Sequence, residues 1–419
     1  MIKKANAIIT VWLFTIATLN AQTLTIDDCY RLAEMNFPLV RQYELLEKSK
    51  DFSIENANKA YLPQIGVYGQ AGYQSEVTSI PISLPDINIP KPSKDQYKLY
   101  GEVQQSVTDL FTTKKQIDLI KANAEAETQK IEVEMYKLRE QINSLFFGIL
   151  LLEAQIKQTE LVQKDIQTGL DRTNVAITNG VALKSAADNM QAELLKNTQR
   201  AVELNAARKG YADMLLMFVG KPTSDSMLLV KPLPPTISSA INRPELQMFE
   251  MQKKAIDAQN SLITIKNMPR LSLFVQGGIG RPGLNMLSDS FDPYYIAGIR
   301  LNWNISGLYT YKNERKALIV NKNKIDVQQD IFIFNTNLAL LQQNSEILKI
   351  HGLLVADNDI ILLRESVKNA TQARLTFGDV TVNDYITAVN AEDMARQNKI
   401  LHEIQLLMIQ YNAKTASGN

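Results

Sequence analysis

The chain has little of the chemistry that marks an enzyme or a metalloprotein, with a single cysteine and two histidines. Cys29 cannot form an intrachain disulfide, and its apolar neighbours predict a small buried residue rather than a nucleophile. His351 and His402 have no cysteine or histidine at ligand spacing, so no metal site and no cofactor are expected. Basic and acidic residues nearly cancel, 45 against 44, and no basic tract occurs. This balance argues against nucleic acid as a partner.

Beyond residue 21 the chain has no long, charge-free apolar run of the kind that a spanning helix needs. Before that point, Lys3 and Lys4 precede an apolar run over 7–19 and a small residue, Ala21. This pattern predicts a cleaved signal peptide over 1–21 and an exported protein, with an uncleaved N-terminal helix as the alternative. If the mature chain enters a membrane, we expect it to do so as β-strands.

Proline is absent from two long stretches, 93–221 and 294–419, although the chain has 14 prolines. Because proline interrupts helices, these stretches can hold very long ones. The first carries a heptad seam at alternating spacings of four and three: Ile131, Met135, Leu138, Ile142, Leu145, Ile149, Leu152 and Ile156.

We therefore predict a long helix over about 112–178 and its counterpart over about 310–376. Each ends at a glycine, Gly180 or Gly378, and a shorter helical stretch follows. The result is two long antiparallel helical hairpins, about 112–218 and 310–416.

Ahead of each hairpin the apolar period changes to two, which predicts β-hairpins over about 64–108 and 271–305. One face is apolar, and the opposite face carries Lys98, Glu102 and Arg300. Each run has about the 9–11 residues that a tilted transmembrane strand requires. Trp303 and the strand tyrosines are expected at the membrane interface or facing lipid rather than at a stacking site. An ordinary sheet packed on a core is the alternative, but the helices already pair with one another.

The two halves resemble each other in sequence, which predicts an internal duplication. Prolines recur 206 residues apart and glycines 198 apart, in the pairs Pro38/Pro244, Pro63/Pro269, Gly180/Gly378 and Gly220/Gly418. Such a period is too long for a stacked solenoid, so each half is a whole structural unit. We expect a first repeat with short helices over 22–220, a proline-containing linker over 221–243 and a second repeat over 244–419.

Four strands cannot close a barrel, and an open edge in hydrocarbon leaves backbone groups unpaired. A spanning chain must therefore oligomerise. Two chains would give eight strands with an interior filled by side chains, whereas three would give twelve strands and a lumen. The polar face with Lys98, Glu102 and Arg300 favours water inside. A homotrimer is the simplest conduit.

Four strands and two long helical hairpins, duplicated behind a signal peptide, resemble the TolC-like outer membrane efflux proteins. The junctions 107–111 and 305–308 look like degenerate forms of that family's Pro-hydrophobic-Phe-Asp-Gly-Gly junction. The resemblance implies a mixed α and β fold. Each protomer would contribute four transmembrane strands to a trimeric 12-stranded barrel in outer membrane lipid, and the hairpins would form a periplasmic α-barrel.

The same resemblance implies a passive exit duct of a tripartite efflux pump or a type I secretion system, without enzymatic activity. Its partners would be a periplasmic adaptor (membrane fusion protein) and an inner membrane RND, ABC or MFS transporter. The barrel lumen would be lined by Lys98, Glu102 and Arg300. The hairpin tips would dock the adaptor through Asn179, Gly180, Val181, Phe377, Gly378 and Asp379.

A periplasmic constriction is implied at Asp384, where the family often places an acidic residue, and Thr387 stands at the position of a second acid. The alternative for Asp384 is a solvated helix start.

Three other interpretations fit the sequence less well. The glycines of 278–283 match the dinucleotide-binding pattern, but Pro282 and the loop after it replace the helix that this pattern needs, so a glycine-rich strand end is favoured. A periplasmic coiled-coil adaptor or chaperone-like structural protein would explain the heptads, but not four alternating strands. An exported enzyme would need a catalytic constellation, and none stands out.

Overall fold

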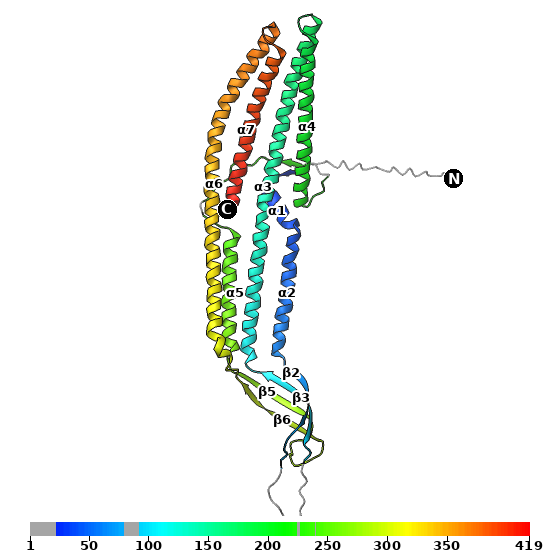
Figure 1. The fold of residues 1–419 in the computed structure, drawn as a ribbon, viewed down its shortest axis with the longest axis vertical. Helices are drawn as coiled ribbons and strands as arrows, with labels where there is room; N and C mark the ends of the chain where they lie inside the picture. Colours follow the sequence, from blue (N-terminus) through cyan, green and yellow to red (C-terminus); the bar gives the residue numbers. More distant parts are fainter. Residues whose placement is uncertain (1–21, 79–91, 224–226, 239) are drawn as a thin grey trace, which may run out of the picture. The chain divides into compact units, whose positions relative to one another are not determined.

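The computed structural model describes residues 22–78, 92–223, 227–238 and 240–419. The predicted signal peptide, 1–21, lies outside these residues, as does the loop segment 79–91. Among the described residues, no helix combines the length and the apolar character that crossing a membrane requires. The elements in chain order are β1 Gln22–Leu24, α1 Ile26–Asn36, α2 Arg41–Asn58, β2 Gln64–Tyr73, β3 Asp95–Ser106, α3 Asp109–Thr178, α4 Lys184–Phe218, β4 Met227–Leu229, α5 Pro244–Lys266, β5 Arg270–Arg281, β6 Asp292–Asn302, α6 Gly307–Phe377 and α7 Val382–Ser417 (Figure 1).

The chain forms two compact units. The helical unit consists of the residues up to Phe37 together with Lys137–Ser238 and Leu340–Thr415. The strand unit consists of Pro38–Tyr136, Ser239–Ala339 and Ala416–Asn419. The continuous helices α3 and α6 contribute residues to both.

The helical unit is built on α3, α4, α6 and α7. Its core includes the α3 side chains Ile142, Phe146, Phe147 and Ile149, each 1% exposed or less. Three of the predicted seam residues, Leu138, Ile142 and Ile149, are therefore buried here, as the heptad pattern requires.

Helix α1 is held against this core near the end of α4. It begins at a capping box, in which Thr25 and Asp28 bond each other's backbone amides. At its end the ring of Phe37 stacks on Phe218, with centroids 6.2 Å apart. Cys29 is fully buried in α1, as expected, and burial raises the pKa of its thiol to about 12. A thiol with this pKa is protonated and unreactive at neutral pH.

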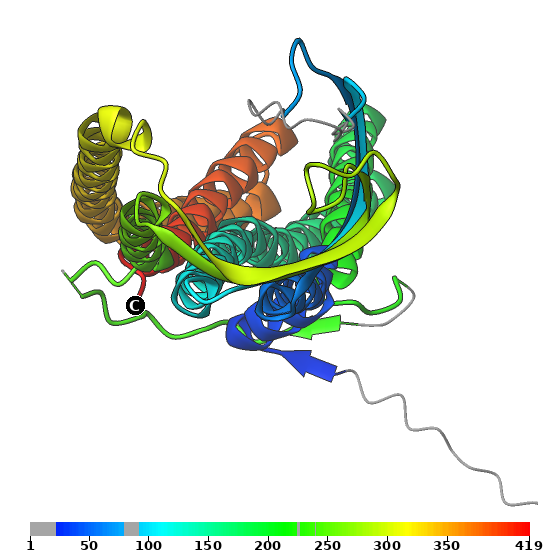
Figure 2. The same ribbon diagram turned by 90° about the horizontal axis from the view of Figure 1, so that it is seen from below.

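In the strand unit, the described strands form an antiparallel sheet in the order β2-β3-β5-β6. The two hairpins meet where β3 pairs with β5, for example Glu102 opposite Gln276. The sheet is strongly curved (Figure 2). Helix α5 starts with Pro244 in its first turn, where a missing N–H costs nothing, and packs on α6 through Phe249 and Phe332, 6.1 Å between ring centroids.

Some elements were not expected from the sequence. Strands β1 and β4 pair in parallel, with Thr23 opposite Leu228, and at three residues each they are too short to show a period. Helix α5 is 23 residues long and lies in a region for which only the repeat boundary was predicted.

Candidate functional sites on the sheet and at the helical tips

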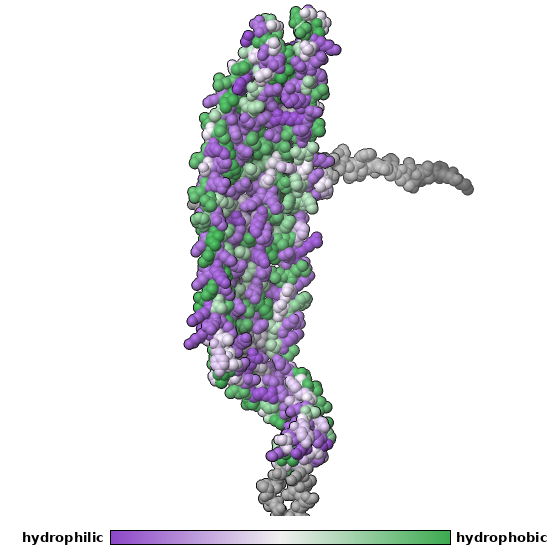
Figure 3. Space-filling view, viewed as in Figure 1, coloured by the Kyte–Doolittle hydropathy of each residue, from purple (hydrophilic) through white to green (hydrophobic). Residues whose placement is uncertain are grey.

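The four-stranded sheet has one apolar face, and that face is exposed. Register places Ile65, Val103, Val275 and Ala297 side by side across the four strands. No helix of the described residues covers them: Ile65 is 80% exposed and Val275 55%. Figure 3 shows hydrophobic side chains on the visible surface of the strand region. Other exposed members of this face are Val67, Tyr73, Leu99, Leu271, Leu273, Ile279, Tyr295, Ile299 and Leu301.

The opposite face is polar and brings together two of the three predicted lumen residues. The guanidinium of Arg300 on β6 donates two hydrogen bonds to Glu102 on β3, at 2.8 and 2.9 Å. It also lies over the ring of Phe274 on β5, 4.3 Å from the centroid. Glu102 is 6% exposed, so its charge depends on this partner. Lys98 lies on the same face of β3 and is exposed.

The strand tyrosines divide between the two faces of the sheet. Tyr295 lies on the apolar face and is 78% exposed. Tyr68, Tyr100 and Tyr294 lie on the polar face with Glu102. Each is two residues along its strand from the residue that shares a register row with Glu102, or from Glu102 itself, and side chains two residues apart point to the same face. The division could have been read from the period-two pattern, in which these three tyrosines align with polar positions.

Both helical tips end in the same glycine-based turn. Gly180 and Gly378 have φ of 76° and 77°, a left-handed conformation that favours glycine. The amides of Gly180 and Val181 donate to the carbonyls of Ile177 and Ala176, at 2.9 Å each. Gly378 and Asp379 repeat this arrangement on Leu375 and Arg374, so both tips are Schellman motifs.

The tips present apolar side chains to the outside. Phe377 is 82% exposed and Val181 79%. No heavy atom lies within 4 Å of the position that a Cβ would take on Gly180 or Gly378. All six residues predicted for adaptor docking are exposed, including Asn179 and Asp379.

Asp384 lies in the first turn of α7 and closes a capping box. Its carboxylate accepts hydrogen bonds from the amide and hydroxyl of Thr381, at 2.8 and 2.7 Å, and its own amide donates to that hydroxyl. These bonds from Thr381 hold the pKa of Asp384 below its usual range. Thr387 is exposed on the next turn, and its hydroxyl donates to the carbonyl of Asn383 at 2.8 Å. Asp384 therefore caps the start of α7 through Thr381, as the alternative of a solvated helix start describes.

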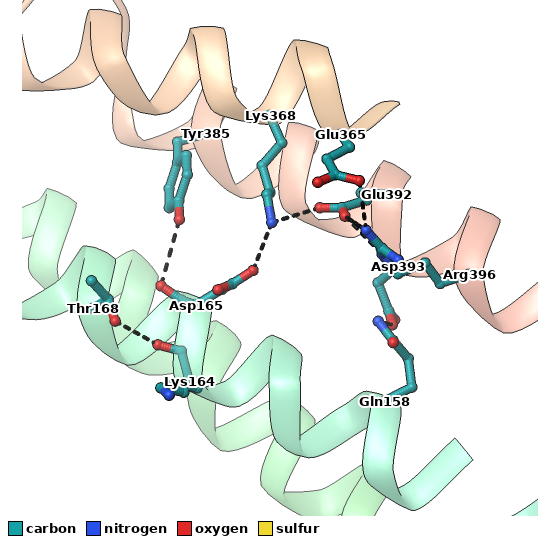
Figure 4. Close-up of polar contacts among 10 residues, drawn as sticks. All are labelled: Gln158, Lys164, Asp165, Thr168, Glu365, Lys368, Tyr385, Glu392, Asp393 and Arg396. Carbon is teal, nitrogen blue, oxygen red and sulfur yellow. Dashed lines mark hydrogen bonds and ion pairs between the residues drawn. The ribbon is translucent and has the colours of Figure 1, made fainter. Parts of the chain in front are cut away.

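Behind the tips lies a layer of charged and polar side chains that was not expected from the sequence, here called the polar layer (Figure 4). Lys368 on α6 points between α3 and α7, where its Nζ lies 2.8 Å from Asp165 and 2.7 Å from Glu392. Glu392 also accepts from Arg396, which lies 2.9 Å from Glu365. The Lys368 and Glu392 side chains are only 14% and 6% exposed.

Burial alone would lower the pKa of Lys368 and raise that of Glu392, because it disfavours charge. In Lys368 the hydrogen bonds with Asp165 and Glu392 outweigh burial, and the pKa is raised. In Glu392 burial is likewise outweighed by the hydrogen bonds from Lys368 and Arg396, and the pKa of this carboxyl is lowered. Both groups are therefore held in their charged forms.

The polar layer also includes α4. Asp393 on α7 lies 3.1 Å from Arg200 on α4 and accepts a 3.1 Å hydrogen bond from Gln158 on α3. The layer thus joins all four long helices of the helical unit. A signal for it was present in the sequence, because Lys368 follows Ile361 by seven residues and so occupies a seam position.

No protein-family model matches the chain. No curated protein matches it in sequence either.

Solved structures, in contrast, match over nearly the whole chain. The outer membrane protein VceC from Vibrio cholerae aligns with a TM-score of 0.67 at 11% identity, covering 94% of this chain and 96% of VceC. The CmeC outer membrane channel from Campylobacter jejuni gives 0.66 at 12% identity, covering 94% and 85%. The open state of the MtrE outer membrane channel from Neisseria gonorrhoeae gives 0.61 at 13% identity, covering 94% and 89%.

The chain thus has the fold of these outer membrane channels, and the predicted resemblance to the TolC-like proteins is confirmed at the level of the fold. These neighbours are channel proteins rather than enzymes.

Proposed function

We propose that the protein is a homotrimeric outer membrane channel that conducts cargo passively from the periplasm to the cell exterior. The observation that carries this proposal is the two-faced sheet, whose uncovered face is apolar from Ile65 on β2 to Leu301 on β6. Burial of this face in lipid would stabilise the protein by about 25 cal/mol for each Å² of apolar surface removed from water. The polar face with Glu102, Arg300 and Lys98 would then line a water-filled lumen.

The edges of the sheet support closure by further copies of the chain. Strands β2 and β6 have ten and eleven residues and a neighbour on one side only in the described sheet. Each unpaired backbone group in hydrocarbon costs several kcal/mol, so these edges need partners in a bilayer. Pairing β6 of one copy with β2 of the next would give twelve strands and a lumen from three copies.

Helix α6 offers a second surface for self-association. It carries apolar residues at heptad spacing on a face distinct from the predicted seam, and each is more than half exposed: Val320, Val327, Ile331, Phe334, Leu338, Leu341, Leu348, Val355 and Leu362. An exposed heptad seam of this length is typical of a helix that packs against another helix. We assign it to the subunit interface of the trimer.

Internal duplication is also part of the proposal. The glycines of the pairs Gly180/Gly378 and Gly220/Gly418 all have positive φ, between 71° and 84°. Equivalent helix ends at a constant spacing support two copies of one ancestral unit, 22–220 and 244–419, joined by the linker 221–243.

We further propose that the chain is the exit duct of a tripartite pump or a type I secretion system. In this arrangement the exposed tips at Val181 and Phe377 dock a periplasmic adaptor, and an inner membrane transporter supplies the energy. Three copies of Asp384, with Thr387 one turn on, would form a ring at the periplasmic constriction. The apolar side chains at the tips support a protein partner there.

Cysteine cross-linking between the edge strands tests the assembly. Gly69→Cys on β2 and Ala297→Cys on β6 place thiols near the middle of each edge, and native Cys29 is fully buried, so background labelling is low. A short bis-maleimide on membranes with the double variant is expected to give bands of two and three chains and none larger.

Each single variant is the matched control and is expected to stay monomeric on the denaturing gel. Failure of the double variant to cross-link would contradict pairing of β6 with β2. Bands continuing beyond three chains would contradict a closed trimer.

A further inference from the structure

One register row of the sheet is almost entirely aromatic. Tyr68 on β2 lies opposite Tyr100 on β3, which lies opposite Gly278 on β5, and Gly278 lies opposite Tyr294 on β6. The row crosses all four strands on the polar face. Adjacent strands are about 4.8 Å apart, so the row spans roughly 14 Å.

Two rings of this row stack on each other, and all three remain accessible. Those of Tyr68 and Tyr100 stack with centroids 5.3 Å apart and an interplanar angle of 26°. Tyr68 is 49% exposed, and Tyr100 and Tyr294 are partly exposed.

Two glycines border this row. A Cβ on Gly66 would come within 2.8 Å of the Tyr68 ring, so glycine leaves room for that ring. A Cβ on Gly278 would come within 2.1 Å of the Leu99 carbonyl oxygen and 2.5 Å of the Tyr100 Cα and Cβ, so glycine lets β5 approach β3 closely beside Tyr100.

The charges beside the row cancel. On one side, Lys98 shares a register row with Asp292, and on the other Glu102 pairs with Arg300. The carboxylate of Asp292 accepts hydrogen bonds from Ser288 and Ser290 in the loop that precedes β6. An aromatic surface without net charge recognises a ligand by its π face rather than by its sign.

We propose that Tyr68, Tyr100 and Tyr294 form a stacking platform for planar aromatic cargo on the lumen side of the strands. This inference rests on the proposed function, because the polar face is a lumen wall only if the sheet closes into a channel. Three copies would place nine tyrosines along the wall. Cargo would move from ring to ring, since each contact is weak and similar to the next.

Equilibrium binding tests the platform without requiring conduction. The probe is 9-aminoacridine, a planar cation, followed by its own fluorescence with the detergent-solubilised protein. Tetrabutylammonium, a cation without a ring, competes with it in a parallel titration. Tyr100→Leu removes a ring, Tyr100→Phe keeps it, and Tyr295→Leu removes a ring from the apolar face as the matched control.

Tyr100→Leu is expected to raise the Kd of 9-aminoacridine about two- to tenfold, and Tyr68→Leu to act similarly. Tyr100→Phe and Tyr295→Leu should bind as the parent does, and tetrabutylammonium should compete poorly in every variant. Circular dichroism checks that each variant is folded.

Unchanged binding in folded Tyr100→Leu would overturn the proposal. An equal loss of 9-aminoacridine affinity in Tyr295→Leu would also overturn it, because binding would then depend on the apolar, detergent-covered face. Efficient competition by tetrabutylammonium would overturn it too, because binding would then depend on charge rather than on an aromatic ring. Block of single-channel current by 9-aminoacridine separates the stacking-site proposal from the proposed channel function. Protein that binds the probe through Tyr100 and passes no current refutes the channel and leaves the stacking site standing.

Discussion

Replacement of Lys368 by methionine is expected to weaken the packing of the helical unit. The substitution keeps most of the aliphatic stem and removes the ammonium that lies 2.8 Å from Asp165 on α3 and 2.7 Å from Glu392 on α7. Glu392 keeps Arg396 as a partner, whereas the link from α6 to α3 through Lys368 is lost.

The magnitude follows from the burial of the three groups. A hydrogen bond to a charged group contributes about 1.5–3 kcal/mol, and breaking a fully buried pair costs about 3–5 kcal/mol. Asp165 is 45% exposed and can be solvated again, so we expect a loss of about 2–4 kcal/mol. At about 2.1 cal/mol/K per residue, the unfolding entropy of 419 residues is about 0.9 kcal/mol/K, and the Tm should fall by about 2–5 °C.

The pH dependence has a definite sign. The pKa of Glu392 is lowered in the folded protein, so its contribution is complete above the unfolded pKa of about 4.3 and is lost as the pH falls through the folded value. The pKa of Lys368 is raised, so its contribution is lost only in strong alkali. Acidification from pH 7 to below pH 4 should therefore lower the Tm of the parent more than that of Lys368→Met.

Thermal unfolding followed by circular dichroism measures both effects. The matched control is Lys349→Met, since Lys349 pairs with Glu346 on the surface of α6 and is 58% exposed. We expect that control to change stability by about 0.5 kcal/mol or less. A Tm for Lys368→Met equal to that of the control, at both pH values, would refute a stabilising role for the polar layer.

Four further outcomes are expected. Gly378→Ala forces a left-handed φ on a residue with a Cβ and should cost about 1–2 kcal/mol locally, seen as faster amide exchange at the tip with the proposed trimer unchanged. Arg300→Met leaves Glu102 buried without its bidentate partner and should lower the temperature at which the proposed trimer dissociates on gels, whereas unchanged dissociation would contradict that role. Cys29 should resist maleimide in the folded protein and react fully in denaturant. Asp384→Asn keeps a cap acceptor and removes the charge, so it should reduce cation selectivity in single-channel recordings with little change in Tm; unchanged selectivity would remove Asp384 from the constriction.

The elements with a strong period were predictable from the sequence, because their pattern is set by local geometry. Helix α3 ends at Thr178, where Gly180 predicted its end, and β5 begins at Arg270, beside the predicted Leu271. Alternation placed Glu102 and Arg300 on one face, although their pairing across β5 needed the strand order.

What was missed depends on contacts between residues far apart in the chain. The row of Tyr68, Tyr100 and Tyr294 exists only once register across β2, β3, β5 and β6 is known. The partners of Lys368 come from α3 and α7, more than twenty residues away in either direction. The second apolar face of α6 was hidden because two seams on one helix blur each other's period.

Current through a planar bilayer tests the central claim most directly. Purified, folded protein added to one side is expected to give discrete steps of one unitary size, as a trimeric channel with a water-filled lumen requires. Folded protein that inserts into the bilayer and passes no current at any applied voltage would contradict the account.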